Sequence, residues 1–321
     1  MKYNQLGRTG VRVSALALGT ATFGVAPLEK DGLKLIDRAL EFGINHIDVA
    51  NSYGNQPHFD RPGAPAAKDR ASSEEIVGKA IKGRRNDIIL SSKVMEPVGE
   101  GVNDRGLSRR HIFQQIERSL KRFDTDHIDI YYAHHPDVTT PIDETVAAFD
   151  DLVRQGKIRY YALSTYPAWR LTDALWKADK MGARPPVANQ IPYNLALRTP
   201  EAEVIPAVLA AGLSLTVFSP LAGGLFAGAA TDGRAFAGAQ RWGGAGFNER
   251  QIELAKKVEA LSAECGISSP HLALAWLIAQ PAVASAVIGP EDMAQLEANI
   301  GAADLDLDPA VLATLNEISK V

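Results

Sequence analysis

Short apolar runs alternate with longer amphipathic segments along the 321-residue chain, and this pattern predicts repeated strand–helix units. In the segments between these runs, apolar residues have the spacing of a helix face, as in Leu33, Ile36 and Leu40, which occupy positions i, i+3 and i+7. The runs themselves have the length of buried strands. Eight strands are expected: Ala15–Leu18, Ile44–Val49, Ile88–Lys93, Ile128–Ala133, Ile158–Leu163, Ala188–Ile191, Ser214–Phe218 and Ala284–Ile288.

Polar and proline residues indicate where several helices begin. Ser73 and the glutamates after it predict a helix with an acidic first turn, and Ser108 is suited to cap the next one. Pro141 fits the first turn of a helix that ends near Gly156. Proline has no N–H, and an N–H in the first turn of a helix would have no acceptor within the helix. A last helix is expected to begin near Pro309.

Eight strands alternating with helices favour a closed (β/α)8 barrel, the TIM-barrel class of α/β fold, over an open sheet. The first residues predict a β-hairpin, Lys2–Leu6 and Val11–Ser14, that would cap one end of the barrel. Two segments, 55–71 and 222–247, exceed ordinary loop length, and loops that follow barrel strands lie on the active face. No linker rich in Pro, Gly or Ser divides the chain evenly, so residues 1–321 are expected to form one domain.

Composition narrows the classes of function. A formal charge of -4 offers no basic surface for nucleic acid. Cys265 is the only cysteine, which excludes an internal disulfide, offers no Cys/His spacing for a metal and fits a cytoplasmic location. The start of the chain lacks the apolar core of a signal peptide. The uncharged stretch Val204–Thr231 contains Pro206 and Gly212, and therefore predicts a helix, a turn and a buried strand rather than a membrane span.

Polar side chains follow three consecutive predicted strands at the point where each strand ends. Asp48, Lys93 and His134 occupy such ends, and Tyr53 lies a few residues after Asp48. In a parallel barrel these ends meet at one mouth, where catalytic side chains are found. Each residue alone has an ordinary structural interpretation, such as a solvated lysine or a hydrogen-bonded histidine. Their joint placement predicts a proton-transfer site.

The four groups suit the protonation of a developing alkoxide. A phenol has a pKa of about 10, and a nearby ammonium favours the phenolate and lowers that pKa. A carboxylate beside the ammonium keeps it charged, and an imidazole can orient a substrate carbonyl. Reduction of that carbonyl also needs a hydride, which no side chain supplies, so a nicotinamide cofactor is implied.

Further motifs extend this pattern in order along the chain: Leu18–Thr20 with Phe23–Gly24, Gly43–Ala50 with Tyr53–Gly54, Ser91–Lys93, Ser119–Phe123, Asp129–His134, Asn189–Asn194 and Phe218–Leu225. Over nearly its full length the chain resembles the aldo-keto reductases. The resemblance implies that Tyr53 is the general acid/base and that Lys93 lowers its pKa. Asp48 would hold Lys93, and His134 would orient the carbonyl. The implied activity is reversible, NAD(P)-dependent reduction of a small aldehyde or ketone to the alcohol.

The resemblance also assigns cofactor contacts. Ser164 and Gln190 would bind the nicotinamide amide, and Phe218 would stack on its ring. Ser219 and Leu221 would contact the pyrophosphate region. The full set expected to contact the cofactor is Gly19, Thr20, Ser164, Thr165, Gln190, Phe218, Ser219, Pro220, Leu221, Gly223, Ile288, Gly289, Glu291, Gln295 and Asn299. Substrate-pocket candidates, chosen from loop position and apolar character, are Phe23, Trp169 and Trp242.

Several positions depart from the family pattern. Thr165 stands where the family usually has asparagine, and His135 matches no catalytic position, so we expect it at the rim. A lysine common near the cofactor phosphates is missing, and Arg234 or Arg241 could substitute for it. Glu291 stands where arginine or serine is frequent, and a carboxylate there would repel a 2′-phosphate or bind a free 2′-hydroxyl. NADP(H), the usual cofactor of the family, is favoured, and Glu291 makes NAD(H) possible.

Alternative functions differ in what they require from the sequence. A metal-dependent barrel hydrolase would need an early His-x-His pair, and a dinucleotide-binding open sheet would need Gly-x-Gly-x-x-Gly; the chain has neither. A Schiff-base aldolase would use a desolvated lysine as nucleophile, whereas Lys93 is expected beside a carboxylate. The serious alternative is a cofactor-binding regulatory or sensor subunit of a membrane channel, with slow or no turnover. The substrate and the oligomeric state are left open by the sequence.

Overall fold

Eight parallel strands close into a barrel in the computed structural model, which describes residues 1–228 and 246–320. The hydrogen-bonded order β10-β3-β4-β5-β6-β7-β8-β9 returns from β9 to β10, which closes the ring. All eight predicted strands are confirmed, with ends that differ by at most two residues. They are β3 (Leu16–Gly19), β4 (His46–Asp48), β5 (Ile89–Val94), β6 (Ile128–Ala133), β7 (Ile158–Ser164), β8 (Ala188–Pro192), β9 (Ser214–Phe218) and β10 (Val283–Ile288).

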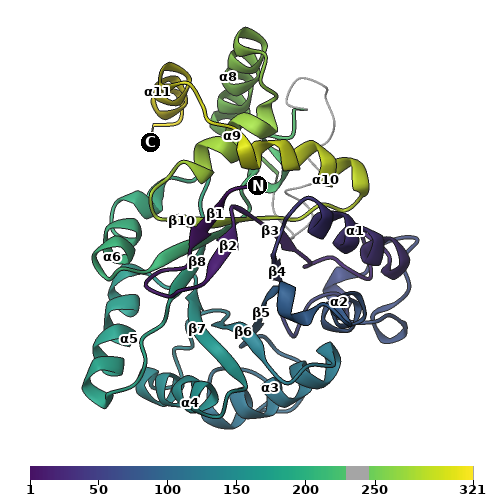
Figure 1. The fold of residues 1–321 in the computed structure, drawn as a ribbon, viewed down its shortest axis with the longest axis vertical. Coiled ribbons are helices and arrows are strands. Elements are labelled where there is room, and N and C mark those ends of the chain that lie inside the picture. The colour runs from purple at the N-terminus through teal and green to yellow at the C-terminus, as the bar shows by residue number, and fades with distance from the viewer. Residues whose placement is uncertain (229–245, 321) are drawn as a thin grey trace.

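Helices surround the barrel on the outside (Figure 1). They are α1 (Glu29–Glu41), α2 (Ser73–Ile81), α3 (Arg109–Phe123), α4 (Ile142–Arg154), α5 (Ala168–Met181), α6 (Val204–Ala210), α8 (Glu249–Cys265), α9 (Ser269–Ile278), α10 (Met293–Ile300) and α11 (Pro309–Ile318). Ser72, one residue before the predicted start, caps α2 and forms a capping box with Glu75, while Ser108 caps α3 as predicted. Pro141 is the N-cap of α4 and thus precedes its first turn.

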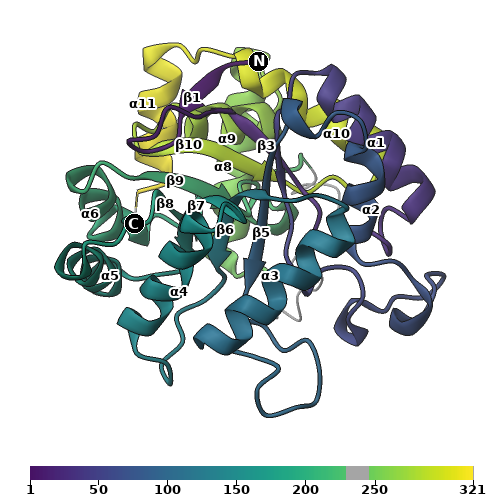
Figure 2. The same ribbon diagram turned by 60° about the horizontal axis from the view of Figure 1, so that its bottom comes forward.

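The N-terminal hairpin, β1 (Tyr3–Gln5) and β2 (Arg12–Ser14), closes one end of the barrel. Leu6 and Val13 are fully buried and pack against barrel-interior residues of β6, β7, β8 and β10. Figure 2 shows the hairpin at one end and the loops that follow β4 and β5 at the other. The capped end is therefore closed by packed side chains, and the opposite end is left to the loops that follow the strands.

The uncharged stretch folds as its interruptions predict. It forms α6, a turn at Gly212 and the buried strand β9, as far as the described residues reach. Across residues 1–228 and 246–320, none of the helices combines the length and apolar character needed to cross a membrane.

The long segment 55–71 is organised around one arginine. Arg70 has a side chain that is 2% exposed, and its guanidinium donates to Asp60 Oδ1 at 2.6 Å. It also donates to the main-chain oxygens of Gln56 at 2.8 Å and Pro65 at 2.7 Å, and to that of Gly54. A buried cation with this many acceptors holds the segment in a defined shape. Most of the second long segment, 222–247, lies outside the described residues.

Candidate active site

The ends of β4, β5 and β6 bring the four predicted polar residues together. Asp48 ends β4, Lys93 is the penultimate residue of β5, and His134 follows β6 directly. Tyr53 lies in the turn after β4 and reaches back over these ends. Its hydroxyl is 3.3 Å from Lys93 Nζ and 3.5 Å from His134 Nε2. The structure thus places one phenol between an ammonium and an imidazole.

Lys93 is completely buried, and its ammonium has a partner for each of its three hydrogens. It donates to Asp48 Oδ2 at 2.5 Å, to the main-chain oxygen of Val49 at 2.8 Å and to Tyr53 Oη at 3.3 Å. Burial by itself lowers the pKa of Lys93, but the charges and hydrogen bonds of Asp48 and Tyr53 together outweigh it and the pKa is raised. The ammonium is therefore charged and fixed in position.

Asp48 is held by residues that the sequence did not connect to it. Its Oδ1 accepts hydrogen bonds from Ser91 Oγ at 3.0 Å and from Gln190 Nε2 at 2.9 Å. Ser91 in turn contacts Nε2 of the fully buried His46 at 3.1 Å. Burial lowers the pKa of His46 to about 4, so this ring is neutral at physiological pH. In the sequence, Ser91 and Ser92 are two polar residues in an otherwise apolar strand, and they were the feature that could have indicated this network.

The protonation states of Tyr53 and His134 suit a proton donor beside a neutral orienting group. Burial raises the pKa of Tyr53, and Lys93 lowers it only in part. The expected net lowering of this pKa is therefore not seen in the structure, because desolvation of the phenolate outweighs the ammonium. Burial also holds the pKa of His134 well below its ordinary value, and the charge of Lys93 adds to this effect. His134 is thus a neutral imidazole.

The positions expected to contact a cofactor lie at the same end of the barrel. Gly19, Ser164, Phe218 and Ile288 end β3, β7, β9 and β10, and Gln190 lies in β8. Other members of the set follow these strand ends: Thr20, Thr165, Ser219, Pro220, Leu221, Gly223 and Gly289. The structure gathers these positions around one mouth, while their contacts with a cofactor stay a prediction.

Ser164 and Gln190 have polar atoms suited to a carboxamide. Ser164 is 1% exposed and Gln190 is 2% exposed. Within the described part of the chain, Ser164 Oγ and Gln190 Oε1 make no hydrogen bond, whereas Gln190 Nε2 is held by Asp48. A carboxamide needs both a donor and acceptors as partners. A hydroxyl and an amide oxygen supply these, so the residues present fit a nicotinamide amide.

Glu291, at the far end of the predicted cofactor set, forms an ion pair that the sequence did not reveal. Arg61 Nη1, from the segment 55–71, lies 2.9 Å from Glu291 Oε1, and the two side chains are 33% and 29% exposed. On the following helix, Gln295 Oε1 accepts from the Glu291 N–H at 3.0 Å, and Asn299 is 8% exposed. The carboxylate expected to oppose a 2′-phosphate therefore has a cation at its side.

The three substrate-pocket candidates have different surroundings. Phe23 is fully buried, and its ring packs close to Gly32 of α1, away from solvent. Trp169, at the start of α5, is 65% exposed and lines a small cavity with Asp137 and Arg170. Trp242 lies outside the described residues, as do Arg234 and Arg241. The contacts described for Phe23 and Trp169 do not place either side chain against Tyr53.

Comparison with known proteins agrees with this architecture. The family model described as the Aldo/keto reductase family matches residues 15–320. An uncharacterized oxidoreductase of Bacillus subtilis (strain 168), YrpG, is 40% identical over 99% of this chain and 96% of the relative. A probable voltage-gated potassium channel subunit beta of Arabidopsis thaliana is 33% identical over 99% of this chain and 96% of the relative. A protein of the same description from Oryza sativa subsp. japonica is 32% identical over 95% of this chain and 92% of the relative.

The family match spans nearly the whole chain, and the relatives are aligned from end to end with high coverage. The closed barrel and the polar residues at its strand ends are consistent with that match. The chain belongs to the aldo/keto reductase family, and this family together with the oxidoreductase of Bacillus subtilis indicates an oxidoreductase.

Proposed function

We propose that this protein reduces an aldehyde or ketone to the alcohol, reversibly, with a nicotinamide cofactor and with Tyr53 as general acid/base. The observation that carries the proposal is the position of the Tyr53 hydroxyl, 3.3 Å from Lys93 Nζ and 3.5 Å from His134 Nε2. A carbonyl oxygen in front of these groups could accept hydrogen bonds from the phenol and the imidazole together.

The proton comes from Tyr53. As negative charge develops on the carbonyl oxygen, the phenol donates its proton, and the Lys93 ammonium stabilises the phenolate that remains. Asp48, with Ser91 and Gln190 on its other oxygen, keeps the ammonium charged and oriented. His134, neutral because of its lowered pKa, donates from Nε2 and orients the substrate without competing for the proton.

The cofactor would supply the hydride, which no side chain can provide. Ser164 and Gln190 would hold its amide, Phe218 would lie against its ring, and the residues after β9 would contact the phosphates. We propose NADP(H) as the favoured cofactor, with NAD(H) possible. The Arg61 guanidinium beside Glu291 supports this order, because it offsets the carboxylate charge that would repel a 2′-phosphate.

A second candidate function is a cofactor-binding regulatory or sensor subunit with slow or no turnover. It is favoured by the relatives from Arabidopsis thaliana and Oryza sativa subsp. japonica, whose names describe them as probable potassium channel subunits. The complete set of four polar residues favours catalysis, since a sensor does not require a phenol poised between an ammonium and an imidazole.

Steady-state oxidation of NADPH and NADH with a panel of aldehydes and ketones separates the two candidates. We expect turnover on the order of 1 s⁻¹ or faster with at least one carbonyl compound, as is usual for enzymes. The same panel with the Tyr53→Phe variant controls for turnover that does not involve the phenol. Tight cofactor binding with negligible turnover across the panel would contradict the enzymatic function and favour the sensor.

A further inference from the structure

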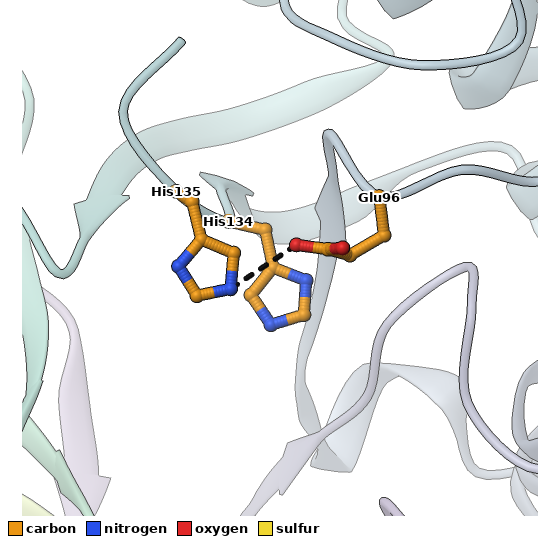
Figure 3. Close-up of side chains that lie close together, drawn as sticks. All are labelled: Glu96, His134 and His135. Atoms are coloured by element: carbon orange, nitrogen blue, oxygen red, sulfur yellow. Dashed lines mark ion pairs between the residues drawn. The ribbon is translucent and has the colours of Figure 1, made fainter. Parts of the chain in front are cut away.

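Three potential metal ligands converge at the edge of the mouth, and one of them, His134, is also one of the four polar residues. Glu96 follows β5, and His134 and His135 follow β6 (Figure 3). One ligand atom from each of the three lies within 4.8 Å of the others. His135 Nε2 is 3.1 Å from Glu96 Oε1, and the two histidine rings are stacked with centroids 4.8 Å apart. The side chains of His135 and Glu96 are 44% and 33% exposed, so solvent reaches them.

The Thr165 hydroxyl lies against the His135 ring. Its oxygen is 2.7 Å from the main-chain oxygen of Ser164 and 2.9 Å from His135 Nδ1. When the hydroxyl donates to Ser164 and accepts from Nδ1–H, Nε2 of the neutral His135 ring presents a lone pair to the Glu96 carboxylate. In that tautomer, a cation between Nε2 and Glu96 Oε1, which are 3.1 Å apart, would satisfy both atoms.

His134 adds a third lone pair to the cluster. Its Nε2 faces the Tyr53 hydroxyl, and a hydrogen on that nitrogen leaves Nδ1 as the acceptor of the neutral ring. Nδ1 is buried and has no hydrogen-bond partner among the residues that the structure describes. Figure 3 shows the His134 ring next to the line that joins His135 and Glu96. A buried acceptor without a donor is costly unless a ligand satisfies it.

We propose that Glu96, His134 and His135 form a binding site for one divalent transition-metal ion of the zinc class. Two imidazole nitrogens and a carboxylate oxygen are a ligand set that zinc accepts, with water in the fourth position. Bonds of about 2 Å place tetrahedral ligand atoms about 3.4 Å apart, so the cluster closes on an ion with small side-chain shifts. Thr165 already provides the hydrogen bond that a metal-bound histidine makes through its other nitrogen.

An ion at this site inhibits carbonyl reduction, an effect that rests on the proposed function. Closing the ligands on the ion moves the His134 ring toward Glu96 and away from Tyr53, across a contact that is already 3.5 Å long. This movement of the ring weakens the orientation of a carbonyl between Tyr53 and His134.

Zinc titration of the cofactor-loaded protein, followed by calorimetry, tests binding without any assay of activity. We expect one ion per chain with a Kd on the order of 1 μM or tighter, and a Kd raised about tenfold or more in Glu96→Gln and in His135→Asn. His127→Asn is the matched control, because His127 Nδ1 contacts Asp126 Oδ1 at 2.6 Å in a pair that no third potential ligand joins among the described residues. This control should keep the Kd of the wild-type protein. Absence of a saturable site, or a Kd in Glu96→Gln and His135→Asn equal to that of the wild-type protein, would overturn the proposal.

Activity measured on the same preparations tests the inhibition separately. Without zinc, Glu96→Gln and His135→Asn should reduce carbonyl compounds at nearly the wild-type rate. With zinc, only the wild-type protein and His127→Asn should lose activity, and a chelator should restore it. Zinc that binds without changing the rate would overturn the inhibitory role. A protein that binds zinc but never reduces a carbonyl would contradict the proposed function alone and leave the metal site intact.

Discussion

Two ion pairs of the site lie in different environments. Lys93 and Asp48 form the floor of the site, and Arg61 and Glu291 form the rim at the end of the predicted cofactor set. On the floor, the side chains of Lys93 and Asp48 are 0% and 4% exposed, and every hydrogen of the ammonium has an acceptor. At the rim, Arg61 and Glu291 are 33% and 29% exposed and join a long loop to the segment before α10. The floor pair has lost its water completely, whereas the rim pair is still partly hydrated.

This difference indicates which properties each region can determine. A desolvated pair is rigid, and removing one partner leaves the other buried without compensation. A half-exposed pair contributes little to stability, and its partners can be exchanged. We therefore expect the floor to control folding and proton transfer, and the rim to control cofactor choice. The following experiments test that division, from the largest expected effect to the smallest.

Loss of Lys93 should be the most damaging change. In Lys93→Met the Asp48 carboxylate stays buried with its main counter-charge removed, so the free energy of unfolding should fall by about 3–5 kcal/mol. Lys34→Met is the matched control, because Lys34 and Asp31 form an exposed pair that should contribute little to the free energy of unfolding. Urea denaturation of both variants measures the difference. Equal losses of the free energy of unfolding in the two variants would show that the buried Lys93–Asp48 pair stabilises the fold no more than the exposed pair does.

The neutral His46 beneath the floor should make stability depend on pH. Its pKa is about 4 in the folded protein, against an ordinary value of 6.5, so between these values the unfolded chain binds more protons. The stabilisation is present above pH 6.5 and is lost as the pH falls toward 4, by up to about 3 kcal/mol. Urea denaturation at pH 7 and pH 4.5 measures it. His46→Gln should flatten this dependence, while an unchanged slope in the variant would assign the effect to other groups.

Reversal of charge at the rim should alter cofactor choice without harming the fold. In Glu291→Arg, two guanidinium groups face the position of a 2′-phosphate, so the preference for NADPH over NADH in kcat/KM should rise about tenfold. Glu297→Arg controls for long-range charge, because Glu297 is 50% exposed and pairs with Arg38. An unchanged preference in Glu291→Arg would show that Glu291 does not act on the ribose.

A smaller effect is expected at Thr165. This residue has φ 58°, a left-handed conformation that asparagine tolerates better than a β-branched side chain. Thr165→Asn should therefore raise the free energy of unfolding by about 1 kcal/mol. Thr165→Val keeps the branched carbon and loses the hydroxyl, so it should give no gain. Destabilisation in Thr165→Asn would show that the hydroxyl contacts outweigh the backbone strain.

The fold was largely readable from sequence, because buried parallel strands are short continuous apolar runs. The error at the start of β4 has a specific cause. The side chain of Asn45 bonds the N-terminal hairpin: its Oδ1 accepts from the Ser14 N–H at 2.7 Å, and its Nδ2 donates to the Arg12 oxygen at 3.0 Å. The Asn45 N–H also bonds the hairpin, donating to Ser14 Oγ at 3.1 Å, while the main-chain oxygen of Asn45 accepts from the Ile89 N–H of β5 at 2.7 Å. Apolar pattern alone placed Ile44 and Asn45 in the strand, since it carries no information on such long-range side-chain bonds.

The site was readable only where residues follow strand ends. That rule gathered Asp48, Lys93 and His134, although their chemical roles stay predictions. It could not reveal the pairing of Arg61 with Glu291, because residues 230 positions apart meet only through the folded chain. The direction of the Tyr53 pKa was also missed, because the cost of burying a phenolate depends on the depth of the mouth.

Single-turnover reduction of a reactive aldehyde by the NADPH-loaded protein tests the central claim, that Tyr53 supplies the proton. The account predicts that Tyr53→Phe slows this step by about 10²–10⁴-fold, the usual contribution of a general acid, while the Kd for NADPH stays at its wild-type value. A Tyr53→Phe variant that reduces the aldehyde at nearly the wild-type rate would contradict the account.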